Sequence, residues 1–205
     1  MRKRFANVLV IVGVITVVSA LALTLYNFWD NSRASRAAME ILEAISGSIP
    51  DSSDRIRPDG EEFIPDYVFN PYMDMPTIEH DGYKYIGVLS IPVIDIDLPV
   101  MDSWSYNKLA IAPCRYSGSA YLNNMVVAAH NYTGHFGRLK NLEVGDTVIF
   151  TDADGNVFNY KVSKIETLVP SAVEEMTSGD WDFTVFTCTI GARTRIAIRC
   201  TLDKF

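Results

Sequence analysis

Three residues of this sequence have types and positions that could carry out chemistry together: Cys188, His130 and Arg195. Cys188 ends the apolar, β-branched and aromatic run FTVFTC at 183–188, and His130 ends a second apolar run, MVVAAH, at 125–130. Arg195 begins the next apolar segment, RIAIR, after a short glycine turn. A thiolate can attack a carbonyl, an imidazole can protonate the leaving amine, and a guanidinium can stabilise the oxyanion. The combination therefore predicts nucleophilic acyl transfer.

Each of these residues also has a simpler interpretation when it is considered alone. Free cysteine is among the most buried residue types, so Cys188 by itself can be core packing. A histidine at a strand end, such as His130, suits general acid or base chemistry, but it is also often a satisfied structural group. The spacing favours the catalytic interpretation, because Cys188 and Arg195 are seven residues apart across the Gly191 turn. Two antiparallel strands joined there would bring the two side chains together.

The other two histidines and one acidic turn carry weaker signals. His80 lies in a proline-rich, acidic segment and His135 lies between glycines, so we expect both to be ordinary loop residues. The segment DADGN at 152–156 resembles the start of a calcium loop, but its twelfth position is Ser163, where an EF-hand needs a glutamate. We therefore expect a polar hairpin turn at this place, and no metal or other cofactor.

The cysteine count limits the possible sulfur chemistry. The chain has three cysteines, so at least one thiol is unpaired or bonds outside the chain. The sequence has no Cys-x-x-Cys pair and no Cys/His cluster, which argues against a zinc site. Cys114 and Cys200 lack a histidine-bearing context, and we expect them to be structural thiols or to form a disulfide with each other.

An apolar segment near the N-terminus is long enough to span a membrane. Residues 8–25 carry no charge and would form a helix roughly 27 Å long, which matches the hydrocarbon core. Aromatic residues follow at 26–29, and the basic residues of 1–5 place the N-terminus in the cytoplasm and the rest of the chain outside. A cleaved signal peptide is the alternative, although YNFWD is bulky where a cleavage site needs small residues.

Composition divides the chain into parts and excludes one class of partner. The formal charge of −7 argues against nucleic acid binding, which needs a basic face. We expect a basic cytoplasmic N-terminus at 1–5, a transmembrane anchor at 6–29, an extracellular helical stem and proline-rich acidic linker arm at 30–80, and the main domain at 81–205.

The main domain is predicted to be all-β. From residue 83 onward, short β-type runs such as YIGVLSIP and IDIDLPV alternate with turn signals. Asp154 and Gly155 separate two alternating runs, which indicates a hairpin. Helical signals are brief here. The pattern is typical of a closed barrel or a sandwich.

Four segments of this domain resemble, in order, the characteristic segments of the sortase family, the cysteine transpeptidases of Gram-positive cell envelopes. TVFTC at 184–188 resembles the family's T-L-x-T-C signature, with Val185 in place of the usual leucine. RIAIR at 195–199 resembles its arginine-led final strand. The segment 126–150 resembles its histidine segment, and 86–100 resembles its opening strands.

This resemblance implies a closed eight-stranded sortase-type β-barrel with short helices, preceded by the transmembrane helix. It assigns Cys188 as the nucleophile, His130 as the general acid and Arg195 as the oxyanion stabiliser. Arg193 points to the same face as Arg195 by strand alternation, but an arginine followed directly by an apolar strand fits the family pattern better at Arg195. The residues expected to bind substrate are Thr187, Thr184 and Asn131.

The implied reaction cleaves an LPxTG-like sorting motif of a secreted protein through a thioester and transfers the acyl group to an amine. The acceptor is an amine of the peptidoglycan cross-bridge or of a pilin lysine. Two other functions stay open: a non-catalytic extracellular barrel that binds envelope polymers, and a thiol hydrolase that releases surface proteins.

The subclass and the role of the linker arm also stay open. Pilin-polymerising members often carry an aspartate–aromatic lid motif upstream of the barrel. This chain has DMP at 74–76, without the aromatic residue, and the difference favours an anchoring enzyme. Residues 50–80 would inhibit the enzyme if they covered the cleft.

Overall fold

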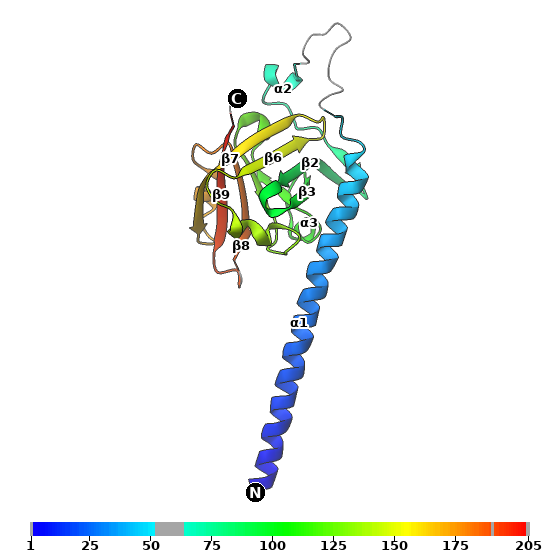
Figure 1. Ribbon diagram of the computed structural model, residues 1–205, viewed down its shortest axis with the longest axis vertical. Helices are drawn as coiled ribbons and strands as arrows, with labels where there is room; N and C mark the ends of the chain where they lie inside the picture. The colour runs from blue at the N-terminus through cyan, green and yellow to red at the C-terminus, as the bar shows by residue number, and fades with distance from the viewer. Residues whose placement is uncertain (1, 52–63, 190, 204–205) are drawn as a thin grey trace. The chain divides into compact units, whose positions relative to one another are not determined.

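The strands after residue 77 form one closed sheet. The computed structural model describes residues 2–51, 64–189 and 191–203, and this part of the chain contains nine strands (Figure 1). The strands are β1 (Ile78–His80), β2 (Tyr83–Ile91), β3 (Ile96–Met101), β4 (Cys114–Ser117), β5 (Met125–Ala128), β6 (Thr147–Asp152), β7 (Val157–Leu168), β8 (Phe183–Cys188) and β9 (Arg195–Leu202).

Eight of these strands close into a barrel. Their order is β1-β2-β3-β4-β5-β8-β9-β7-β6, and β6 also pairs with β2, so the ring closes and only β1 lies outside it. Two neighbouring pairs, β3–β4 and β5–β8, are parallel, and the other pairs are antiparallel. The predicted closed eight-stranded barrel is therefore confirmed, and the sandwich alternative is excluded by the β2–β6 pairing.

Short helices precede β1 and occupy several connections between strands. The α-helices are α2 (Asp66–Phe69), α3 (Tyr106–Leu109) and α4 (Val173–Thr177), and the 3-10 helices are η2 (Pro92–Ile94), η3 (Ala120–Leu122) and η4 (Phe136–Asn141). The helix η4 follows β5, and α4 lies in the connection from β7 to β8. Both helices are therefore close in sequence to the parallel strands β5 and β8.

The hairpin between β6 and β7 is the expected polar turn. The carboxylate of Asp152, which is fully buried, accepts hydrogen bonds from the backbone N–H groups of Asp154 and Asn156. It also accepts from the Asn156 side chain and from the Tyr121 hydroxyl, both at 2.7 Å. Four protein donors therefore satisfy the charge of Asp152, which gives this carboxylate a structural role in the turn.

The N-terminal helix α1 (Arg2–Ser46) contains the apolar segment. From Ala6 it is, among the described residues, the one helix long and apolar enough to cross a membrane, and a signal sequence would meet the same criteria of length and composition. Contacts divide the chain into a first unit, residues 1–33, and a second unit, residues 34–205.

The last part of α1 belongs to the barrel unit. Ala34, Ala38, Ile41 and Ile45 are buried at intervals of three and four residues, so they form one stripe along the helix. Ile41 and Ile45 pack in a cluster that includes Tyr85 and other core residues. α1 ends at Ser46 and runs without a break from the predicted anchor at 6–29 into the predicted helical stem.

The described part of the linker arm packs on the barrel as well. Tyr67 of α2 stacks on Tyr121 with ring centroids 4.4 Å apart, and Met75 is buried in the main core cluster. Phe69 and Tyr72, in contrast, are largely exposed. Residues 52–63 of the arm whose inhibitory role stayed open lie outside the described residues.

Replacing Ile45 with alanine should lower the free energy of unfolding by about 2–4 kcal/mol, because it leaves a cavity in a closed cluster. Thermal unfolding of the full-length protein in detergent, followed by circular dichroism of the barrel, measures this effect. Met39→Ala on the exposed side of the same helix is the matched control and should have little effect. An equal loss in both variants would show that the stripe does not anchor the helix to the barrel.

Candidate active site

The pairing of β8 with its two neighbours aligns three strand ends. In the parallel pair β5–β8, Ala128 lies opposite Phe186, and the next residue, Ala129, donates its N–H to the Phe186 carbonyl at 3.2 Å. Cys188 lies two residues after Phe186, as His130 lies two residues after Ala128. Continuing this register by two residues places His130 next to Cys188, and both residues line the same groove.

Arginine approaches Cys188 from the opposite side. In the antiparallel pair β8–β9, Cys188 and Arg195 are the last paired residues. Thr189 and Thr194 close the turn beyond them, because the Thr189 N–H donates to the Thr194 carbonyl at 3.0 Å and their hydroxyls are 2.9 Å apart. The thiol therefore stands between an imidazole and a guanidinium at one end of the barrel.

A groove with a volume of about 210 Å³ leads to the thiol over the outer face of the sheet. His130, Cys188 and Arg195 line it together with mainly apolar residues of two connections, 104–109 and 169–176. Phe186 lies in its floor, two residues before Cys188 on the same face of β8. The groove can accept an extended chain with apolar side chains, with its reacting carbonyl at Cys188.

A row of aromatic rings forms one side of this groove. The ring centroids lie 5.8 Å apart for Tyr106 and Trp104, 5.4 Å for Trp104 and Tyr116, and 5.3 Å for Tyr116 and Phe186. Tyr106 is 79% exposed, whereas Phe186 is partly buried, so the row runs from the surface to the floor beside Cys188. Edge-on and tilted contacts at these distances stabilise the ring positions.

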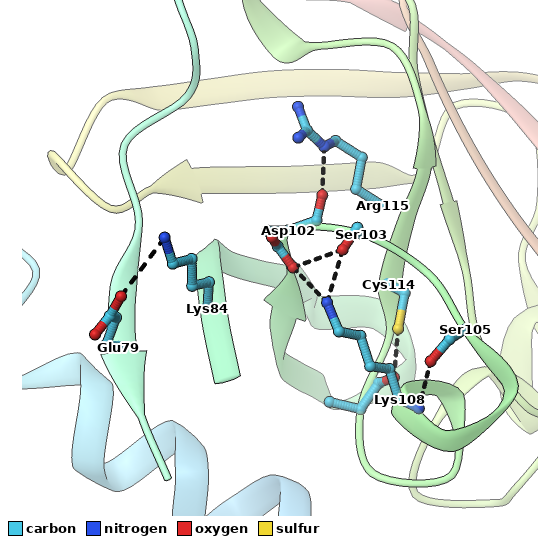
Figure 2. Close-up of polar contacts among 9 residues, drawn as sticks. Glu79, Lys84, Asp102, Ser103, Ser105, Lys108, Cys114 and Arg115 are labelled. Carbon is cyan, nitrogen blue, oxygen red and sulfur yellow. Dashed lines mark hydrogen bonds and ion pairs between the residues drawn. The ribbon is translucent and has the colours of Figure 1, made fainter. Parts of the chain in front are cut away.

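A charged cluster holds the segment that carries Trp104 and Tyr106. Figure 2 shows Lys108 Nζ donating to Asp102 Oδ1 and to Ser103 Oγ, both at 2.7 Å. Arg115 Nε donates to the Asp102 carbonyl at 2.7 Å in the same view. Burial alone would raise the pKa of Asp102, but the hydrogen bonds from Lys108 and Ser103 outweigh burial and lower it. The charged form of Asp102 therefore stabilises this side of the groove.

Arg199 holds the opposite side of the groove, which is formed by the segment 169–176. Its side chain is only 2% exposed, and it donates from Nε to Glu166 Oε1 at 2.8 Å and from NH1 to the Thr184 hydroxyl at 3.2 Å. It also donates to the carbonyl oxygens of Met176 and Glu175 in the last turn of α4. A buried cation at a helix C-terminus satisfies orphan carbonyls. Arg199 thus fixes α4 against the sheet.

A second groove meets the first at the thiol. It has a volume of about 650 Å³, and its lining includes Cys188, Thr187, Thr189 and Ile196 from the sheet end. The rest of its lining comes from the β5–η4 loop and from η4 itself. A group bound to the Cys188 sulfur is therefore accessible from two directions.

The family model of the sortase domain matches residues 89–203. The chain belongs to the sortase family. Sortases are cysteine transpeptidases, and the matched range contains all three aligned residues of the strand ends. Among curated proteins, no sequence matches this chain.

Solved sortase structures share the fold at low sequence identity. The sortase D5 transpeptidase of Clostridium perfringens superposes with a TM-score of 0.56 at 17% identity, covering 84% of this chain and 99% of that one. Sortase C of Streptococcus pneumoniae gives 0.55 at 20% identity, covering 86% and 89%. Sortase C1 of Streptococcus agalactiae gives 0.54 at 24% identity, covering 62% and 72%. Similar structures include sortases of classes A, C, D and E, so the subclass is unresolved.

The residues expected to bind substrate occupy different places in this sortase. Thr187 is buried and donates its hydroxyl hydrogen to the Ala129 carbonyl at 2.8 Å, so its side chain joins β8 to β5. Asn131 is exposed and lines the second groove. Thr184 lines neither groove, because it is buried beneath α4, where it accepts from Arg199. Arg193 is exposed in the turn and also lines neither groove.

Cys114 and Cys200 are structural thiols in different places. Both are fully buried, in separate clusters, and all three cysteines are free. Burial raises the pKa of each of these two thiols to about 12. Neither forms the disulfide that stayed open as an alternative, and neither carries appreciable thiolate at neutral pH.

Sequence reasoning did not find the residues that build the sides of the grooves. Trp104 lies in a short polar segment, and Arg199 ends the run RIAIR with no sign of its buried partners in the local sequence. A run such as DSWSYNK does contain an aromatic pair among polar residues, which is a weak signal for a functional loop. No pattern along the chain links that segment to the one at 169–176.

A mild thiol alkylator should label Cys188 and spare Cys114 and Cys200 in the folded protein, because Cys188 is partly exposed, whereas the other two thiols are buried and protonated. Peptide mass mapping after brief exposure to iodoacetamide measures the labelling of each thiol. Labelling after unfolding in guanidinium is the control and should modify all three. Equal labelling of Cys188 and Cys200 in the folded protein would contradict the structure.

Arg199→Met should destabilise the sortase by about 3–5 kcal/mol, because it leaves the partly buried Glu166 carboxylate without its best partner. Lys164→Met removes the exposed partner of the same carboxylate and should cost about 0–1 kcal/mol. Thermal unfolding of both variants measures the difference, and similar losses would contradict the assigned role of Arg199.

The effect of Arg199→Met should also depend on pH. Burial alone would raise the pKa of Glu166, but hydrogen bonds from Lys164 and Arg199 lower it in the folded state. The stability from this carboxylate is therefore complete above its unfolded value of about 4.3 and is lost as pH falls through the lowered folded value. The difference in melting temperature between the wild type and Arg199→Met should therefore become smaller as the pH falls through this range.

Proposed function

We propose that this sortase is a membrane-anchored transpeptidase in which Cys188 is the nucleophile, His130 the general acid and Arg195 the oxyanion stabiliser. The observation that carries the proposal is the strand register: Cys188, the last residue of β8, pairs directly with Arg195, and His130 lies two residues after the end of the parallel strand β5. A free thiol that is partly exposed, with an imidazole and a guanidinium on its two sides, suits attack on a carbonyl.

The reaction proceeds in two balanced halves. The Cys188 thiolate attacks the carbonyl carbon of the scissile peptide bond, and the guanidinium of Arg195 stabilises the resulting oxyanion. The C–N bond then breaks as His130 gives its proton to the leaving amine, which leaves a thioester. An amine acceptor attacks that thioester, the C–S bond breaks, and a proton returns to His130 as the new amide bond forms.

The apolar groove is the proposed binding site for the donor peptide. Its aromatic row and the segment 169–176 suit an LPxTG-like sorting motif, whose apolar residues would be buried before the scissile bond. Thr184 supports this groove through Arg199 rather than by contact with the peptide, and Thr187 supports it through Ala129.

The apolar helix supports a location at the cell membrane. We propose that residues 6–29 anchor the protein, with the basic N-terminus in the cytoplasm and the barrel outside, where secreted substrates and cell-wall amines occur. None of the described residues 64–80 lines either groove at Cys188, which argues against inhibition by that part of the arm.

Incubation with a panel of sorting-motif peptides should yield a thioester on Cys188, detectable by mass spectrometry of the intact protein. Arg195→Gln should lower kcat/KM by about 10²–10³, because it removes an oxyanion donor. Arg193→Gln carries the same charge change two residues away and should stay within a few fold of wild type.

Three outcomes would contradict the proposal. Absence of any thioester, with an unreactive Cys188, would favour a non-catalytic binding barrel. A thioester that is only hydrolysed, even with amine acceptors at high concentration, would favour a hydrolase. A larger loss in Arg193→Gln than in Arg195→Gln would reassign the oxyanion stabiliser.

A further inference from the structure

We propose that the second groove at Cys188 binds the amine acceptor, and that it selects an amine whose molecule also carries a free carboxylate, held by Arg138 and Lys140. This inference rests on the proposed function, because it concerns the second half of that reaction. It adds the chemical class of the acceptor, which the strand ends alone do not specify.

The position of the second groove suits an acceptor. The donor peptide fills the apolar groove, so the thioester is left open only toward the other groove, which Cys188 also lines. Asn131, Thr133 and Asn141 line the second groove with polar groups, in contrast to the aromatic side chains of the first. A polar molecule that approaches the thioester carbonyl therefore enters here.

The second groove is basic although the protein is acidic. The chain has 25 acidic and 18 basic residues, yet Arg138 and Lys140 line this groove and none of its described lining residues is acidic. Among the described residues, Arg195, on the other side of the thiol, donates only to the Ala192 and Thr194 carbonyls of the turn. Positive charge is thus concentrated around Cys188.

Two basic side chains elsewhere on the barrel lie close to carboxylates. Lys84 pairs with Glu79 at 3.5 Å, and Lys108 pairs with Asp102 at 2.7 Å (Figure 2). In contrast, Arg138 lies 4.0 Å from Asp95, whose side chain is 98% exposed, so solvent screens most of that attraction. A carboxylate brought into the groove would meet charge that the protein leaves largely uncompensated.

The backbone fixes η4, which carries both cations, beside the thiol end of the sheet. Gly137 approaches the preceding loop so closely that a Cβ there would lie 2.6 Å from the Asn131 carbonyl oxygen. The Gly137 N–H donates to the Tyr132 carbonyl at 2.9 Å, and Arg138 Nε donates to the Thr133 carbonyl at 3.2 Å. The cations are therefore presented from a compact turn and not from a free loop.

Electrostatics then decides which amine is used. A basic groove disfavours an ammonium ion, so an isolated lysine side chain on a neutral stretch of chain enters poorly. A free carboxylate in the same acceptor offsets this repulsion through charge-assisted hydrogen bonds to Arg138 and Lys140. The positive field also favours the neutral amine, which is the form that attacks the thioester.

The test compares two acceptors that differ only in one carboxylate: acetyl-Lys-Ala with a free C-terminus, and the same peptide as its C-terminal amide. The measured quantity is the ratio of the two ligation rates, with one donor peptide and at low salt. We expect a ratio of about ten in favour of the acid, falling as salt rises, because exposed charge pairs are screened.

Arg138→Gln combined with Lys140→Gln should bring the ratio to about one. The matched control is Lys84→Gln combined with Lys161→Gln, which removes the same charge from β2 and β7 and should keep the ratio of the wild type. A ratio near one in wild type, or a preference that survives the loss of Arg138 and Lys140, would overturn the proposal.

A binding experiment separates this proposal from the function on which it rests. The Cys188→Ala protein forms no thioester, so NMR titration with the two acetyl-Lys-Ala peptides tests the second groove independently of catalysis. Shifts at 131–141 with the acid and much weaker shifts with the amide support the proposal, even if no donor peptide ever forms a thioester. Equal shifts with both peptides, or shifts elsewhere only, contradict it.

Discussion

The parallel pairing of β5 with β8 is the constraint on which the candidate active site depends. Parallel strands place their C-terminal ends at the same edge of a sheet, so two segments far apart in sequence finish side by side. The hydrogen bond from the Thr187 hydroxyl to the Ala129 carbonyl joins residues 58 positions apart, immediately before Cys188 and His130. A slip of one residue in this register would turn one of these side chains toward the other face of the sheet.

Charged side chains hold both sides of the apolar groove in place. Asp102 with Lys108 holds one side, and Glu166 with Arg199 holds the other. A buried arginine is tolerated because its donors reach a carboxylate, a hydroxyl and two carbonyls, which offsets the cost of removing it from water. The apolar surface that would meet a peptide is thus positioned by polar groups behind it.

The sequence was informative where local pattern and chemistry coincide. Alternation of apolar residues identified the strands, and the strand ends at Cys188, His130 and Arg195 were apparent because reactive side chains follow apolar runs. Closure of the barrel by β2 and β6 and the packing of Ala38 and Ile45 against the sheet depend on long-range contacts, which alternation does not encode. Thr184 illustrates the limit: its place in the signature suggested contact with substrate, but its partner is Arg199, fifteen residues later.

The burial of one face of α1 at residues 34–46 has a consequence for proteolysis of this protein. A protease that cuts between residues 51 and 64 breaks the chain after Ile45 and before β1, yet Ala38, Ile41 and Ile45 remain packed in the interior of the barrel unit. The two fragments would then be held together by the same contacts that stabilise the fold. Such a cut therefore leaves the segment 34–46 of α1 bound to the barrel without a covalent link.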